Sequence, residues 1–124
     1  MRSEGIESQF SVPYTPQQNG AAERINRSMQ DVVRTLLVQS GLGASLWAEA
    51  VGYFVYTKNR SPHRAINDVP ERIWTSQAPM VSHLRPFGCR AWKYVAEPHQ
   101  RAVKLAPRGL ARISVGYSPD HRAY

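Results

Sequence analysis

Hydrophobic residues recur along the first half of the chain with the period of an amphipathic helix. Between residues 21 and 38 they fall three and four positions apart, which is the spacing of one buried helical face. Gly41 and Gly43 follow as helix-ending residues. The pattern therefore predicts a helix over this segment, with an inward face formed by Ala22, Ile25, Met29, Val32, Val33, Leu36 and Leu37.

Two shorter helices are predicted downstream. Ser45 can cap a helix that runs to about residue 59, and Pro62 closes that segment. Pro70 suits the first position of a third, short helix because its fixed φ is helical. The inward face of the second helix is expected to comprise Leu46, Trp47, Ala50, Val51, Phe54 and Val55.

Strands are predicted near both ends of the chain. Residues 6–12 read as a short strand ended by Pro13 and Pro16, and "QQNG" then supplies a polar loop. Residues 89–97 and 111–118 are rich in aromatic and β-branched residues and predict strands of a small β module. Trp92 and Tyr94 are two apart and so share one strand face, where we expect core packing rather than stacking on bases.

Composition places the chain among small globular proteins. Its 124 residues and 42% hydrophobic content suit one domain or one and a part. No apolar run approaches the roughly 20 residues of a membrane span, and residues 1–10 lack the apolar core of a secretion signal. With a single cysteine, Cys89, we expect a soluble protein in a reducing, intracellular compartment, without a membrane partner.

The charge is unevenly distributed. The formal net charge is +7, of which residues 1–62 contribute +1 and residues 63–124 contribute +6. Such an excess is typical either of a polyanionic partner or of a solvated basic face. The C-terminal cations are Arg85, Arg90, Lys93, Arg101, Lys104, Arg108, Arg112 and Arg122.

A polar stripe runs along the first predicted helix, opposite its apolar face. Glu23, Arg27, Gln30 and Arg34 fall within about 60° of one another on a helical wheel. Periodicity alone favours a solvated surface held by an acid–base pair at i and i+4. A glutamate in the first turn is also stabilised by the helix dipole and needs no function to explain it.

Longer motifs change that interpretation. Residues 13–23 match the pattern P-Y-x-P-Q-x-x-G-x-x-E, which resembles the integrase core of retroviruses and retrotransposons. "YTPQQNGAAERINRSM", "LWAEAV", "NRSP", "IW", "VSHLRPFGC" and "VGYS" follow in the order of the copia-type branch, within the Pol polyprotein. The resemblance covers the chain from about Gly5 to Tyr124.

The resemblance implies a fold class and a chemistry. The fold is α/β: the C-terminal portion of a ribonuclease-H-like core (a strand, a loop and two or three helices), then a small, incomplete SH3-like β-barrel. The family's core holds Mg²⁺ on two Asp and one Glu, and Glu23 matches that Glu as catalytic and metal-binding residue. The implied DNA-binding residues are Gln17, Gln18, Asn19 and Gly20 in a mobile loop, and Arg24, Arg27 and Gln30 on the first helix.

The same resemblance shows what the sequence lacks. The family's second Asp lies about 35 residues before the Glu, whereas 22 residues precede Glu23 here and none is Asp. Two divalent cations need several carboxylates, so we expect the chain to be catalytically inactive alone. The sheet on which the first helix packs is also missing, which predicts a loosely packed N-terminal half.

The implied organisation has three parts: the end of the catalytic core at residues 1–62, a connector with a short helix at 63–80, and a basic SH3-like segment at 81–124. The implied partners are element ends and target DNA, the rest of the Pol polyprotein and a homo-oligomer, with the parent acting in the nucleus. The alternative is a non-catalytic module that binds nucleic acid or another protein. His and Cys spacings fit no zinc motif.

Overall fold

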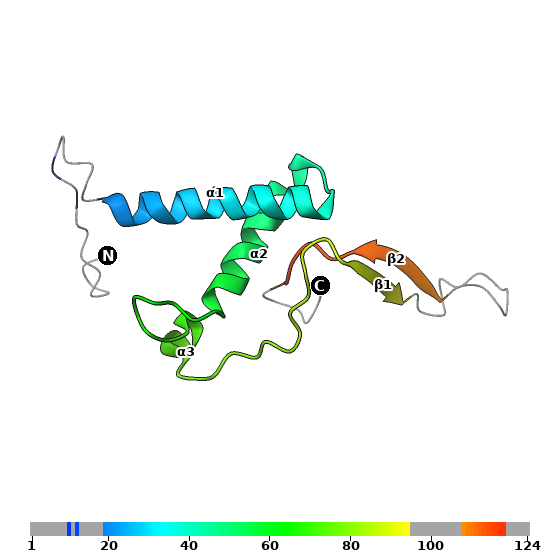
Figure 1. The fold of residues 1–124 in the computed structure, drawn as a ribbon. Helices are drawn as coiled ribbons and strands as arrows, with labels where there is room; N and C mark the ends of the chain where they lie inside the picture. Colours follow the sequence, from blue (N-terminus) through cyan, green and yellow to red (C-terminus); the bar gives the residue numbers. More distant parts are fainter. Residues whose placement is uncertain (1–9, 11, 13–18, 95–107, 119–124) are drawn as a thin grey trace.

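The computed structural model describes residues 10, 12, 19–94 and 108–118. This part of the chain is mixed α/β, as predicted, with helices followed by a small antiparallel sheet (Figure 1). Its elements in chain order are α1 (Gly20–Ser40), the 3-10 helix η3 (Ala44–Leu46), α2 (Trp47–Asn59), α3 (Pro70–Thr75), β1 (Arg90–Tyr94) and β2 (Gly109–Ile113).

Helix α1 confirms the first prediction in both type and extent. It ends where Gly41 adopts a left-handed conformation (φ 68°), and the Gly41 N–H donates to the carbonyl of Val38 at 3.3 Å. A left-handed cap of this kind suits glycine, which has no Cβ to clash. Glu23 lies in the first turn, where the helix dipole favours a negative charge.

The starts of the two later helices differ from each other. Ser45 was expected to cap α2, but it lies inside η3, and α2 begins after Leu46 with no side-chain cap. The 3-10 turn therefore takes the place of a capping side chain. Helix α3 begins at Pro70 as predicted.

The core is small and lies where α1 crosses α2. The residues buried there are Val33 from α1, Ala50 from α2 and Phe87 from the segment before β1. Because Ala50 has no side chain beyond Cβ, the two helices can approach closely at this position. Partly buried hydrophobic residues surround the core, namely Met29, Leu36, Leu37, Leu42, Val51, Tyr53 and Val115.

The predicted inward faces of α1 and α2 are only partly correct. Ala22 and Ile25 are exposed, because the crossing with α2 lies toward the C-terminal half of α1 (Figure 1). Val32, next to the buried Val33, was also expected on the inward face and is exposed. Trp47 and Val55, which were also expected to be buried, are largely exposed as well. The apolar pattern thus located both helices, whereas the limited contact between α1 and α2 determined which of their residues are buried.

The two strands form an antiparallel hairpin that projects away from the helices (Figure 1). Trp92 pairs with Ala111 and Tyr94 with Gly109. The hairpin is joined to the helical part beside Phe87, where Gly88 N–H donates to Ser114 O at 2.8 Å. The first predicted strand is confirmed at Arg90–Tyr94, and the rest of that predicted segment, residues 95–97, lies outside the described residues. The second strand begins two residues earlier than predicted and ends at Ile113, so residues 114–118, which were also expected to be in the strand, lie outside it.

Other predictions are not decided by the structure. Of the expected strand at 6–12, only Phe10 and Val12 are described; both are exposed and outside any strand, and the remainder lies outside the described residues. The ribonuclease-H-like and SH3-like assignments and the three-part domain division stay predictions. Within the described residues no helix is both long and apolar enough to cross a membrane.

Candidate nucleic-acid interface

The predicted catalytic and DNA-binding residues that the structure describes lie on the first half of α1. Asn19 and Gly20 stand at its start, and Glu23 follows in the first turn. Glu23 and the predicted DNA-contacting residues Arg24, Arg27 and Gln30 are all exposed. Gln17 and Gln18, the other two residues of the predicted loop, lie outside the described residues.

The expected acid–base pair on this stripe is not present. Glu23 and Arg27 form no ion pair; instead Arg34 pairs with Asp31 at 3.5 Å, and both side chains are well exposed. The carboxylate of Glu23 is thus not held by a described cation. In the part of the chain that the structure describes, no three His, Cys, Asp or Glu side chains come together in a group that could hold a metal.

The second basic surface is the β1–β2 hairpin. Arg90 and Lys93 on β1 and Arg108 and Arg112 on and beside β2 are exposed, and none forms an ion pair with a described carboxylate. Residues 76–94 and 108–118 contain no Asp or Glu at all. Like charges so close together are unfavourable unless they are solvated or meet an anion, so this hairpin can accept phosphate groups.

The sequence-based expectation that Trp92 and Tyr94 pack in a core is wrong. Both were expected to pack in a core, but their exposed fractions are 67% and 63%. Core packing would require a second layer over this face of the hairpin, and no described residue supplies it. The two rings are therefore part of the exposed surface, on the same face as Arg90.

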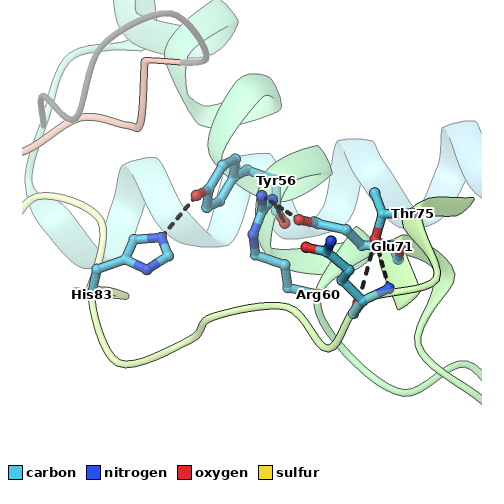
Figure 2. A network of polar contacts seen from close by, with 6 residues as sticks. Tyr56, Arg60, Glu71, Thr75 and His83 are labelled. Carbon is cyan, nitrogen blue, oxygen red and sulfur yellow. Dashed lines mark hydrogen bonds and ion pairs between the residues drawn. The ribbon is translucent and has the colours of Figure 1, made fainter.

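A separate polar network ties α3 and the segment around His83 to α2 (Figure 2). The hydroxyl of Tyr56 lies 2.8 Å from Nε2 of His83, and the guanidinium carbon of Arg60 lies 3.4 Å from the centre of the Tyr56 ring. Arg60 also pairs with Glu71 of α3 at 2.8 Å, with both side chains mostly buried. The network joins α2, α3 and the segment around His83 at one aromatic ring, that of Tyr56.

Aromatic stacking extends this network toward the C-terminal end of the described chain. The Tyr117 ring stacks on Tyr56 with centroids 4.5 Å apart and on Tyr53 at 5.8 Å. Burial raises the pKa of the Tyr53 phenol above its ordinary value, and the neighbouring Tyr117 acts in the same direction. These contacts fasten the segment after β2 onto α2.

Sequence reasoning did not identify this network. Tyr56 and His83 are 27 residues apart, and Arg60 and Glu71 are eleven apart. The partners lie in different elements, separated by turns and loops, so no local pattern could indicate the pairs. In contrast, Asp68 and Arg72 have the helical i, i+4 spacing; their ion pair, with its hydrogen bond, lowers the pKa of the Asp68 carboxyl.

The comparisons with known proteins point to transposons. The chain is 41% identical over 123 residues, or 98% of its length, to the retrovirus-related Pol polyprotein from transposon TNT 1-94 of Nicotiana tabacum. It is 30% identical over 121 residues to the retrovirus-related Pol polyprotein from transposon RE1 of Arabidopsis thaliana, 97% of this chain. An uncharacterised mitochondrial protein of Arabidopsis thaliana is 38% identical over 85 residues, which cover 68% of this chain and 67% of that protein.

The chain corresponds to one segment of the two polyproteins, since it spans 9% of the tobacco protein and 8% of the first Arabidopsis protein. No protein-family model matches it, and no solved structure matches it. The two polyprotein matches extend over nearly all of its residues, in agreement with the family resemblance seen in the motifs. Nearly the whole chain is therefore homologous to one segment of the retrovirus-related Pol polyproteins of plant transposons.

Proposed function

We propose that this chain is the segment of a retrotransposon integrase that carries the last carboxylate of the catalytic core and the basic strands after it. The observation that carries the proposal is the P-Y-x-P-Q-x-x-G-x-x-E pattern at residues 13–23, inside a match of 41% identity to a Pol polyprotein. The exposed position of Glu23, three residues after the start of α1 at Gly20, supports it.

In the parent enzyme, Glu23 is a metal ligand. Arg27 and Gln30 lie on the same side of α1 as Glu23, with Arg24 beside them, so these residues are placed to contact the phosphates or bases of a DNA end approaching Glu23. The residues described here do not fit a Mg²⁺ site by themselves, because no further acidic group joins Glu23. The chain alone is therefore expected to bind DNA without joining strands.

A chimera tests this assignment. The chain replaces the matching segment of the tobacco polyprotein, and the product is assayed with Mg²⁺ for joining of labelled 3′-hydroxyl DNA ends to a target duplex. The unchanged tobacco segment is the positive control. We expect the chimera to join DNA and Glu23→Gln to abolish joining.

Glu49→Gln is the matched control, because Glu49 is an exposed acid in the first turn of α2, as Glu23 is in α1. Joining by the Glu23→Gln chimera at the unsubstituted level would show that Glu23 is not a ligand. Joining by the isolated 124-residue chain would overturn the expectation that it is inactive alone.

The basic hairpin favours a second candidate function, a module that binds DNA without catalysis. Its four exposed cations, which form no ion pair with a described carboxylate, would release counterions from DNA, so affinity should fall steeply with salt. In this case Glu23→Gln leaves DNA binding by the isolated chain unchanged or slightly stronger, because a negative charge near phosphate is removed. Replacing Arg90 and Arg112 by Ala should weaken binding and flatten the salt dependence.

A further inference from the structure

The face of the hairpin that carries Trp92 and Tyr94 has an unusual composition. The pairing register places Arg90, Trp92 and Tyr94 on one face of β1, opposite Ile113, Ala111 and Gly109 of β2. The two rings thus stand across from the two smallest side chains of β2. A Cβ on Gly109 would lie 3.5 Å from Cε3 of Trp92, so the indole leans over the glycine backbone. The two rings remain largely exposed.

The positive charge of the hairpin indicates which kind of molecule could bind to it. Every ionisable side chain of Lys, Arg, Asp or Glu type in the described hairpin is a cation: Arg90, Lys93, Arg108 and Arg112. Arg90 lies on the same face as the rings, whereas the register places Lys93 and Arg112 on the opposite face. A second copy of the chain would bring its own cationic hairpin against this one, which is unfavourable. Aromatic faces beside exposed cations are instead the combination that binds stacked bases and phosphates together.

The distance between the two rings favours binding of a single strand over binding of a duplex. Residues two apart on a strand are about 6.8 Å apart. Stacked bases in a duplex are separated by about 3.4 Å, and their faces are covered by neighbouring bases. Adjacent bases can therefore reach both rings only when they are spread apart, as in an extended single strand.

We propose that the Trp92–Tyr94 face of the β1–β2 hairpin binds single-stranded nucleic acid, with one base stacked on each ring and Arg90, on the same face, contacting a phosphate. This goes beyond the integrase role of the segment and does not depend on Glu23 or on strand joining. The structure shows no group that would read the 2′-hydroxyl among the described residues of this face, so DNA and RNA strands are both expected to bind.

Fluorescence anisotropy with the full 124-residue chain tests the proposal. The probes are labelled single strands of DNA and RNA of about 12 nucleotides, a duplex of the same sequence, and an abasic DNA strand of the same length. The abasic strand keeps the phosphates and removes the stacking faces. We expect both single strands to bind more tightly than the abasic strand or the duplex at the same salt concentration.

Substitutions provide the second readout. Trp92→Ala should weaken single-strand binding about 5- to 150-fold, which is the range for loss of one stacked base, and Trp92→Phe should retain most of the affinity. Trp74→Ala is the matched control, because Trp74 lies on α3, away from the hairpin, and is 91% exposed. This control variant should bind like the unsubstituted chain.

Three results would overturn the proposal: equal affinity for the abasic strand, duplex binding as tight as single-strand binding, or no effect of Trp92→Ala in a chain whose circular dichroism is unchanged. The comparison with the abasic strand uses the unsubstituted chain, so this test remains valid even if a variant fails to fold. Binding of DNA alone or RNA alone would support stacking and identify the strand. None of these measurements requires catalysis, so their outcome is separate from that of the chimera.

Discussion

Gly88 lies where the hairpin is joined to the helices, and replacing it by Ala should be unusually damaging. Its φ is +77°, a left-handed conformation that is unfavourable for residues with a Cβ. A Cβ at this position would also overlap the Cβ of Ser40 at the end of α1 and lie 3.3 Å from the Ser40 Cα. The substitution therefore combines backbone strain with a collision against another element.

The two effects can be given separate magnitudes. Left-handed backbone costs a residue with a Cβ about 1–2 kcal/mol. Forcing an extra carbon into occupied space typically costs a further 1–3 kcal/mol, so Gly88→Ala should destabilise by about 2–5 kcal/mol in total. Gly41 has a similar φ of +68° but nothing within 4 Å of its Cβ position, so Gly41→Ala should show only the backbone cost.

Thermal unfolding followed by far-ultraviolet circular dichroism measures the difference. At roughly 4 °C per kcal/mol, Gly88→Ala should lower the midpoint by about 8–20 °C and Gly41→Ala by about 4–8 °C. In a Ser40→Gly background, which removes the overlapped atom, the cost of Gly88→Ala should fall to that of Gly41→Ala. Equal effects of the two alanine variants, or no coupling to Ser40, would show that Gly88 is not packed against α1.

Four further predictions concern the network on α2 and the packing of the whole chain. Tyr56→Phe removes the hydroxyl bonded to His83 Nε2 and should destabilise by about 1–3 kcal/mol, measured by urea unfolding. Arg60→Met should cost more than Glu71→Gln, because Arg60 also stacks on Tyr56; an equal cost would show that stacking contributes nothing. The Tyr53 phenol should ionise at higher pH than a free tyrosine, because burial in the fold favours its neutral form. The stability that it contributes is therefore full below pH about 10 and is lost as the pH rises through the raised pKa. Absorbance titration at alkaline pH measures this ionisation. Finally, the small core predicts a broad melt of the isolated chain, and a sharp, cooperative transition would contradict it.

The family resemblance and the proposed role of Glu23 could be inferred from the sequence, because both depend on motifs. The P-Y-x-P-Q-x-x-G-x-x-E pattern led to the transposon polyproteins, which the comparisons then showed as relatives. The role of Glu23 as a metal ligand stays a prediction, because it depends on carboxylates that this chain does not contain. The structure adds that Glu23 is exposed and that Arg27 does not pair with it.

Local elements were determined by the sequence itself. The period of α1, its end at Gly41, the start of α3 at Pro70 and the positions of the strands all depend on backbone preferences that act within a few residues, so neighbouring residues suffice to predict them. Only the tertiary structure decided which side chains are covered. Burial of Val33 and Phe87, exposure of Ile25 and Trp92, and the contact of Tyr56 with His83 depend on which distant surface each residue meets, and the chemical character of a side chain does not specify that surface.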